Sequence, residues 1–456
     1  KVAFPGQVFS SAALLTTFYQ EHMPFELTNA QKQVIREIFA DMRSGKQMNR
    51  LLQGDVGSGK TIVAFISMLL AIDNGAQACL MAPTEILADQ HYQGLKQFAD
   101  LLGITIAKLT GSVKKKDRVG LHEDLQSGKL QILVGTHALF EDSVQFKNLG
   151  MCIIDEQHRF GVAQRAKLWD KNKTFHPHIL VMTATPIPRT LAMTLYGDLD
   201  ISIINELPVG RKPIQTTHRY DTHRLQVFAF IQSELSKGRQ IYIVYPLIEE
   251  SEKMDFKDLM DGYESISRAF PEVPLGILHG KMKPADKDIE MARFVKNETK
   301  IMVATTVIEV GVNVPNASIM VIESAERFGL SQLHQLRGRV GRGAEQSYCI
   351  LMSSHKLSND SKIRMETMVR TNDGFEISEV DLKLRGPGDI MGKQQSGVLN
   401  LQIADLVKDK DILQLARYHA IKLLKEDAPM EHPKHAKLRE AFIEMSKKKT
   451  IWNYIS

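Results

Sequence analysis

The sequence predicts an α/β protein made of two successive parallel sheets and a helical C-terminal part. In the first half, short apolar runs alternate with helix-like segments, at 78–82, 105–109, 132–135, 151–154 and 179–182. A second series follows at 240–245, 275–279, 301–304, 319–322 and 347–352. Continuous apolar strands separated by helices indicate parallel sheets covered on both faces. From about residue 353 the strand pattern stops and helical, charged segments follow. Among them, the Gly-rich, polar run 385–397 predicts a loop that is long enough to suggest function.

The domain boundaries follow from breaks in this pattern. A chain of 456 residues is too long for one ordinary core, so two or three domains are expected. Residues 1–24 mix helix and turn signals, and we interpret them as a connecting segment. The first lobe covers 25–207, because two prolines and a glycine in the next residues indicate a hinge. The second lobe covers 208–352, and 353–456 form the helical C-terminal part.

Composition and charge set broad limits on function. The chain is 43% hydrophobic and 24% charged, as in ordinary globular proteins, and its net charge of +5 permits a polyanionic partner without requiring one. Cys79, Cys152 and Cys349 lie in apolar runs without metal-ligand spacing, which is typical of buried thiols in a reducing compartment. The longest apolar run, 62–72, is too short to span a bilayer, and no signal peptide is recognisable. We therefore expect no membrane partner, and a start at Lys1 without Met indicates a fragment.

Residues 54–61 fit the phosphate-loop pattern G-x-x-x-x-G-K-[ST]. A strand end precedes them and a helix follows, which is the context that the motif requires. The glycines let backbone N–H groups surround phosphates, and the helix N-terminus adds its positive end. Lys60 would reach the β- and γ-phosphates, and the Thr61 hydroxyl would bind Mg²⁺. The predicted nucleotide-binding residues here are Gly54, Asp55, Val56, Gly57, Ser58, Gly59, Lys60 and Thr61.

A helix start just ahead of this loop adds candidates for binding the base. Thr28 or Asn29 caps a helix that runs to about Arg43. The Gln31 amide could pair with both the acceptor and the donor edge of adenine. A plain helix cap is the ordinary interpretation of such a glutamine, but its place ahead of a phosphate loop favours a nucleotide role. Phe25 is included with Gln31 among the nucleotide-binding candidates.

Asp155 and Glu156 follow the apolar run 151–154. A carboxylate at this strand end, in the sheet that carries the phosphate loop, can hold Mg²⁺ directly or through water. Glu156 is placed to orient or deprotonate the attacking water. Asp-Glu pairs are common on solvated surfaces, yet the end of a buried strand beside a phosphate loop favours catalysis.

The arginines of 335–343 are spaced by small residues after a helix and look like poor core material. They could form a solvated basic loop or a general polyanion patch. The functional interpretation is that they are arginine fingers, which reach the γ-phosphate across a cleft and stabilise the transition state. The second lobe has no phosphate loop of its own, so its closure on the first would turn nucleotide state into displacement.

Hydroxyl, histidine and glycine residues recur where predicted strands end. Such groups are ordinary ligands of nucleic-acid backbone phosphates, although each alone is more often a helix cap. Their recurrence in both lobes favours a nucleic-acid track. The candidates are Thr84, Thr110, Gly111, Thr136, His137 and Thr305, with Gly280 and Lys281 beside them in the second lobe.

Taken together, residues 25–345 resemble the superfamily 2 nucleic-acid helicases, most closely the RecG family of branched-DNA translocases. The run Asp155-Glu156-Gln157-His158-Arg159-Phe160-Gly161 has the form seen in RecG and in the transcription-repair coupling factor. Segments 372–375, 384–388 and 395–397 look like the translocation motif that these two families share, a helical hairpin followed by a loop. Segments 52–61 and 81–88 are more similar to RecG than to the coupling factor.

The resemblance implies two tandem RecA-like lobes with a C-terminal helical hairpin and helical extension. It also implies residue roles. Gln31 would read adenine, Lys60 and Thr61 would hold phosphate and Mg²⁺, and Asp155 and Glu156 would do the metal and base work. The remaining roles are coupling of hydrolysis to DNA by Gln157, His158, Thr183 and Thr185, arginine fingers at Arg339 and Arg342, and translocation by Arg364, Arg385 and Gln395.

The implied function is ATP-driven translocation on double-stranded DNA, with Mg²⁺ as cofactor, acting on stalled forks and Holliday junctions. The resemblance further implies a monomeric motor in the bacterial cytoplasm, and single-stranded-DNA-binding protein is a further candidate partner. RecG proteins carry an N-terminal wedge domain that grips the branch point, and nothing in 1–24 matches it. We therefore expect the motor and C-terminal part alone, with weakened branch selectivity.

Two alternatives stay open at this point. A coupling-factor motor that pushes RNA polymerase would share most of these motifs. A non-catalytic nucleic-acid-binding protein with a relict ATPase belongs to a different class, and the intact set of Lys60, Thr61, Asp155, Glu156, Arg339 and Arg342 opposes it. The charge cluster at 434–449 is interpreted as a solvated helical face rather than a DNA contact.

Overall fold

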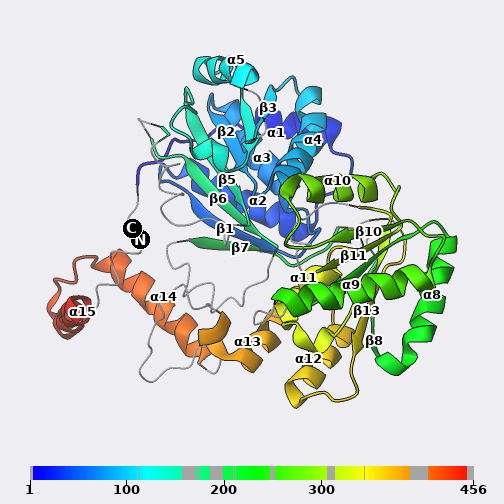
Figure 1. The fold of residues 1–456 in the computed structure, drawn as a ribbon. Coiled ribbons are helices and arrows are strands. Elements are labelled where there is room, and N and C mark those ends of the chain that lie inside the picture. The colour runs from blue at the N-terminus through cyan, green and yellow to red at the C-terminus, as the bar shows by residue number, and fades with distance from the viewer. Residues whose placement is uncertain are drawn as a thin grey trace. The chain divides into compact units, whose positions relative to one another are not determined.

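The computed structural model describes residues 4–111, 113, 115–156, 171–172, 175–184, 199–208, 210, 212–246, 252–305, 314–341, 343, 345–390 and 409–448. The chain divides into two compact units. The larger unit spans 2–186 and 200–377 and contains both sheets. The smaller unit comprises residue 1, 187–199 and 378–456, and its regular described elements are all helices. Figure 1 shows the elements with their labels.

The first sheet has seven parallel strands in the order β3-β4-β2-β5-β6-β1-β7. Neighbouring strands that run parallel end at the same edge, so the residues after β1, β2, β4, β5 and β6 gather there. This confirms the predicted parallel sheet. The strands are β1 Asn49–Gly54, β2 Gln77–Met81, β3 Ile106–Leu109, β4 Ile132–Gly135, β5 Leu149–Asp155, β6 His178–Thr183 and β7 Asp200–Ile204.

The first lobe is held together by helices packed on this sheet. Its principal helix, α3 (Lys60–Asp73), is buried from Ile62 to Ile72, and this explains why it is apolar on every side. In Figure 1 it lies against the strands, with α4 (Glu85–Leu101) beside it. The other described helices are α2 Asn29–Arg43, α5 Lys115–Ser127 and the 3₁₀ turn η2 His137–Phe140.

The N-terminal segment is part of this core. Its α1 (Ala13–Thr17) continues into a π-helical turn, η1 (Phe18–His22). Phe9 and Phe18 are fully buried, and the Phe18 ring lies 5.1 Å from that of Phe65 and 5.3 Å from that of Phe98, edge to face. The interpretation of 1–24 as a connecting segment did not anticipate this packing, because two isolated aromatics give no periodic signal.

The second sheet has six parallel strands in the order β10-β11-β9-β12-β13-β8. The sequence missed β8 here and β7 in the first sheet. Both are edge strands, and their mixed burial means that neither presents the continuous apolar run used to find the others. The strands are β8 Gln215–Tyr220, β9 Gln240–Tyr245, β10 Leu275–Leu278, β11 Ile301–Thr305, β12 Ala317–Ile322 and β13 Tyr348–Ser353. The helices are η4 Asp221–His223, α8 Arg224–Ser236, α9 Glu252–Ala269, α10 Pro284–Val295, η5 Ala325–Arg327 and α11 Leu330–Arg337.

The C-terminal part is helical, as predicted, with α12 Asn359–Arg370, α13 Gly374–Ile390, α14 Lys410–Glu426, η6 Pro433–His435 and α15 Ala436–Lys448. The prediction of a loop from Arg385 was wrong up to Ile390, because α13 continues through Gly386, Pro387 and Gly388. Gly and Pro cost a helix about 1 and 3 kcal/mol relative to alanine, so the turns of α13 before Gly386 must offset that cost. The rest of that predicted loop, 391–397, lies outside the described residues.

Two further expectations concern apolar residues. All three cysteines are buried and free, as their apolar surroundings predicted. Within the described ranges, every helix is too short or too polar to cross a bilayer.

Candidate active site

The phosphate loop connects the end of β1 to the start of α3. Gly57 and Gly59 have φ of 76° and 84°, the left-handed region that favours glycine. A Cβ on Gly59 would also lie 2.2 Å from Nε2 of Gln31. The glycines of the motif are therefore required by this backbone.

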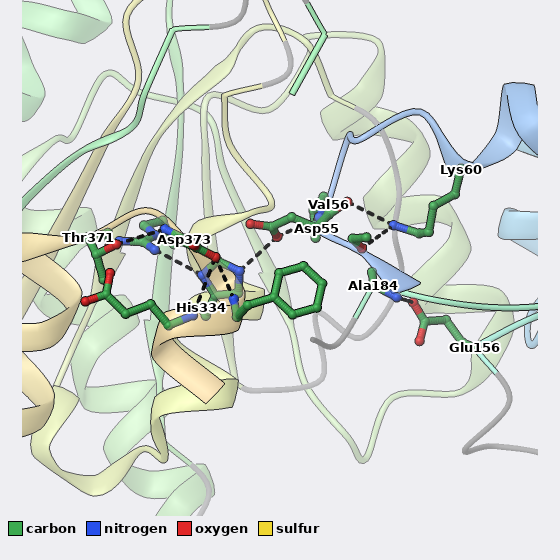
Figure 2. A network of polar contacts seen from close by, with 12 residues as sticks. Asp55, Val56, Lys60, Glu156, Ala184, His334, Thr371 and Asp373 are labelled. Carbon is green, nitrogen blue, oxygen red and sulfur yellow. Dashed lines mark hydrogen bonds and ion pairs between the residues drawn. The ribbon is translucent and has the colours of Figure 1, made fainter. Parts of the chain in front are cut away.

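Lys60 lies folded over its own loop. Its Nζ donates to the carbonyl oxygens of Gly54 and Asp55, at 2.7 and 2.9 Å (Figure 2). An ammonium with three donors can exchange these neutral carbonyls for phosphate oxygens, which carry charge and form stronger hydrogen bonds. The side chain is thus held directly over the loop that is predicted to bind phosphate.

Gln31 connects α2 to this loop. Its Oε1 accepts from the N–H of Thr28 at 2.9 Å, and the Thr28 hydroxyl accepts from the N–H of Gln31, so the predicted helix cap is a full capping box. Its Nε2 donates to the carbonyl of Ser58 at 2.8 Å. Gln31 is 1% exposed and both ends of its amide contact protein, and adenine recognition stays a prediction. Phe25 is 48% exposed, a ring face open to a ligand.

Asp155 ends β5 and contacts a histidine that the sequence analysis did not single out. Nε2 of His91, on α4, lies 2.8 Å from Oδ2 of Asp155, and the two side chains are only 11% and 13% exposed. His91 shares a helix face with the buried Leu87, Ala88 and Leu95. Its position among apolar residues at helical spacing is the one sequence signal that could have drawn attention to it.

Glu156 is held in an unusual backbone conformation. Its φ is 52°, which is rare for a residue with a side chain and costs about 1–3 kcal/mol. Its carboxylate accepts from the N–H of Ala184 at 3.0 Å (Figure 2). It also accepts from the Thr183 hydroxyl at 3.4 Å. These contacts fix the carboxylate at the end of β6. The second contact also joins Glu156, the predicted general base, directly to Thr183, a predicted coupling residue.

The donor set at this edge fits Mg²⁺. The Thr61 hydroxyl and the Asp155 carboxylate are hard oxygen donors, which this ion prefers. No cluster of three or more His, Cys, Asp or Glu suited to a metal occurs among the described residues. Mg²⁺ commonly takes one or two protein carboxylates and completes its shell with phosphates and water.

A chain of polar contacts runs from the phosphate loop into the second lobe (Figure 2). Oδ1 of Asp55 lies 2.8 Å from Nε2 of His334 on α11. Nδ1 of His334 lies 3.0 Å from Nη2 of Arg337, whose Nη1 donates to the carbonyls of Met368 and Thr371 at 2.8 and 2.9 Å. The loop that would bind phosphate is therefore linked to the end of α12 through three side chains.

The two charged side chains at the ends of this series of contacts, Asp55 and Arg337, keep their charges although Asp55 is partly buried and Arg337 fully buried. Burial acts to raise the pKa of Asp55, but the hydrogen bonds from His334 and from the N–H of Val56, with the charge of Lys60, outweigh it and leave that pKa below its usual value. Asp55 is therefore ionised at neutral pH. Burial lowers the pKa of Arg337, which still stays far above neutrality for a guanidinium.

Arg337 corrects the expectation that the arginines of this segment are poor core material. It is 1% exposed and is the largest fully buried side chain among the described residues. The guanidinium fork makes this possible, because Thr216 also accepts from it, at 3.2 Å. Sequence spacing alone cannot show that four acceptors converge on one arginine.

The arginine-finger candidates follow immediately. A Cβ on Gly338 would lie 2.9 Å from Cγ2 of Val56, so this turn packs directly against the phosphate loop. Arg339, next in the chain, is partly exposed. Arg342 lies outside the described residues, as do Gln157, His158, Thr185 and Gln395.

The strand-end candidates of the first lobe come together, because β3, β4 and β2 are adjacent. Thr84 caps α4, accepting from the N–H of Leu87 at 3.3 Å, while Gly111 and His137 are exposed. Thr110 is buried, with 1% exposed. Thr136 in this lobe and Thr305 in the second are each 2% exposed, and neither hydroxyl has a hydrogen-bond partner among the described residues. Buried polar groups are rarely left unpaired, so both hydroxyls are unusual for a folded protein.

The two described translocation candidates are tied to protein. Arg364, on α12, donates to the carbonyls of Phe328 and Glu326, at 2.9 Å each, and so fastens α12 to the segment before α11. Arg385 pairs with Asp381 one turn back on α13, at 3.1 Å. Their predicted roles stay predictions.

Three family models match the chain in succession. Residues 28–194 match the DEAD/DEAH box helicase model, and 225–344 match the helicase conserved C-terminal domain. Residues 371–456 match the model of ATP-dependent DNA helicase RecG, domain 3, C-terminal. The last match includes α13, α14 and α15, beyond the part that helicases in general share.

Curated relatives and solved structures agree with these models. The chain is 52% identical to ATP-dependent DNA helicase RecG of Bacillus subtilis over 96% of its length, and 51% identical to that of Synechocystis over 93%. It spans 64% and 51% of those two proteins. A structure described as RecG bound to a three-way DNA junction matches with 42% identity and a TM-score of 0.76. The match covers 90% of this chain and 53% of the chain in that structure. Yeast Dbp5 bound to RNA, at 16% identity and a TM-score of 0.56, shares the fold alone.

Proposed function

The chain belongs to the RecG family of helicases, and from that premise we propose that it is the motor part of an ATP-driven double-stranded-DNA translocase that remodels branched DNA. The observation that carries the proposal is the intact phosphate loop, whose Asp55 is contacted by His334 of the second lobe. A motor needs that arrangement, because nucleotide state must reach a second body to become movement. The relative bound to a three-way junction supports branched DNA as the substrate class.

The proposed chemistry uses residues of both lobes. Lys60 and the loop N–H groups bind the phosphates, and Phe25 and Gln31 lie toward the base. Thr61 and Asp155 would hold Mg²⁺, which supplies charge neutralisation at the β- and γ-phosphates when bound. Glu156 orients the attacking water and accepts its proton. Arg339 and Arg342 stabilise charge on the γ-phosphate from the second lobe.

Nucleic acid would run along the strand-end loops of both lobes. Thr84, Gly111 and His137 offer a helix N-terminus, a backbone and an imidazole to its phosphates. Gln157, His158, Thr183 and Thr185 would couple this track to hydrolysis, and Arg364, Arg385 and Gln395 would turn lobe movement into translocation. A monomeric motor, a bacterial cytoplasmic location and contact with single-stranded-DNA-binding protein complete the proposal.

The two alternatives fare differently. The coupling-factor alternative loses support, because 371–456 match the RecG C-terminal model. ATP hydrolysis distinguishes the proposal from a nucleic-acid-binding protein with a relict ATPase, because only the proposed motor would hydrolyse ATP.

The test is ATP hydrolysis by the chain with no nucleic acid, RNA, single-stranded DNA, linear duplex and a model fork. All are compared at one salt concentration, because phosphate contacts are strongly salt-dependent. We expect stimulation by DNA and not by RNA, with the fork at least equal to the duplex. Stimulation by RNA would contradict the proposal. If no nucleic acid stimulates hydrolysis, adding the wedge domain of a RecG protein separates a wrong assignment from a motor that needs this domain.

A Gln395→Ala variant is expected to keep most DNA-stimulated hydrolysis but to translocate poorly. The reason is its proposed place between lobe movement and duplex DNA. Displacement of a triplex strand from a duplex measures translocation without requiring a branch. Normal displacement by this variant would remove the basis for assigning Gln395 to translocation.

A further inference from the structure

The contact between His91 and Asp155 is not needed to build the sheet. Asp155 ends β5, where a solvated carboxylate would be stable without a partner, yet it is 13% exposed and lies 2.8 Å from an imidazole nitrogen. His91 lies on the apolar face of α4, where burying an aliphatic side chain would cost less free energy than burying an imidazole. A buried histidine against a buried carboxylate at a proposed metal position calls for a functional explanation.

The geometry restricts how Asp155 can act. Because Oδ2 is engaged by Nε2 of His91, the carboxylate cannot rotate freely, and Oδ1 is the oxygen that lies outside this contact. Removing a residue that holds a metal-binding group in one orientation commonly lowers metal affinity or activity by about 10–100-fold. Holding one oxygen also favours a single-oxygen contact, which suits the strict octahedral shell of Mg²⁺.

The helix that carries His91 begins at the proposed nucleic-acid track. α4 is capped by Thr84, and a Cβ placed on Gly111 would lie 3.2 Å from Oε1 of Glu85, its first residue. A displacement at these loops would therefore be transmitted along one rigid helix to His91.

We propose that His91 is a positioning residue for Asp155, and that α4 is the route by which nucleic acid at the strand-end loops alters metal binding in the nucleotide site. The inference deepens the proposed function and rests on it. The divalent ion is the ligand concerned, and His91 acts on it through Asp155 rather than by direct contact.

The test measures Mn²⁺ affinity in the presence of ADP, from the electron paramagnetic resonance signal of free Mn²⁺, with and without duplex DNA. We expect His91→Ala to weaken Mn²⁺ binding by about tenfold or more, and to abolish any change that duplex DNA causes in the wild-type chain. His91→Gln should regain most of the affinity, because the glutamine amide can donate a hydrogen bond at similar reach. Lys96→Ala, on the exposed face of the same helix where Lys96 pairs with Asp100, should bind Mn²⁺ as the wild type does.

Wild-type Mn²⁺ affinity in His91→Ala would overturn the proposal. So would equal weakening in the Ala and Gln variants accompanied by equal loss of thermal stability, since that result describes a packing role. An effect of duplex DNA that survives in His91→Ala would overturn the route through α4. A wild-type chain that shows no DNA-stimulated hydrolysis fails the proposed function instead, and the comparison of Mn²⁺ affinities without DNA still decides the role of His91.

Discussion

A Glu156→Gln variant is expected to lose about two orders of magnitude or more of ATP turnover while still binding nucleotide. Glutamine keeps the size of the side chain, and its oxygen can still accept from the N–H of Ala184. It cannot take a proton from water, and removal of a general base costs about 10²–10⁴-fold. Single-turnover hydrolysis gives the chemical step, and a fluorescent nucleotide gives the affinity.

Lys60→Ala should reduce turnover comparably but through a different loss. Without the ammonium group, which now contacts two carbonyls of the loop, the phosphate loop has no lysine charge to bind phosphate. Both nucleotide affinity and hydrolysis should therefore fall. DNA binding should be spared in both variants, because neither side chain belongs to the strand-end track.

Glu206→Gln is a matched control for the loss of a carboxylate. Glu206 is exposed, and it accepts from the N–H of Ala30 at the start of α2. We expect near wild-type turnover. Full activity in either Lys60→Ala or Glu156→Gln would refute the assignment of the active site.

The parallel sheets could be predicted because buried strands have to be apolar along their whole length. Edge strands escape that requirement, and this explains why the polar β8 (Gln-Thr-Thr-His-Arg-Tyr) was missed. Phe9 and Phe18 were missed for a related reason, since a core contact made by one aromatic residue leaves no periodic pattern. Gly386 and Pro387 caused the opposite error. Their low helix propensity predicted a loop, whereas α13 extends through both residues.

The candidate site divides in the same way. The phosphate loop could be found from sequence, since its backbone demands glycines at fixed spacing, and Gly57 and Gly59 have the required φ. The contacts of His91 and His334 could not be found. Each depends on a carboxylate far away in the sequence, Asp155 and Asp55, and only the fold brings each pair together.

The second large effect concerns stability. An Arg337→Ala variant is expected to lose about 3–5 kcal/mol of unfolding free energy in the second lobe, because removing one partner of a buried polar network leaves the others unpaired. Those left would be the carbonyls of Met368 and Thr371, the Thr216 hydroxyl and Nδ1 of His334. Urea unfolding followed by circular dichroism, with hydrogen exchange of α11 and α12, would locate the loss.

Two comparison variants make this prediction specific. Arg268→Ala removes an exposed arginine that pairs with Glu264 on α9, and should change stability by no more than about 0.5 kcal/mol. Arg337→Lys keeps the positive charge but cannot reproduce the planar fork, so most of the loss should remain. If Arg337→Lys were as stable as the wild type, charge alone would explain the burial and the hydrogen-bond argument would be wrong.

The effect should also reach the phosphate loop. His334 contacts Arg337 through Nδ1 and Asp55 through Nε2, so loss of the guanidinium frees the imidazole to turn away from Asp55. The effects of Arg337→Ala and Asp55→Asn on nucleotide affinity should therefore not add, since contacts in one network are coupled by about 0.5–3 kcal/mol. Strict additivity would mean that the two lobes meet at this point without exchanging free energy, and the chain of contacts would then be packing rather than communication.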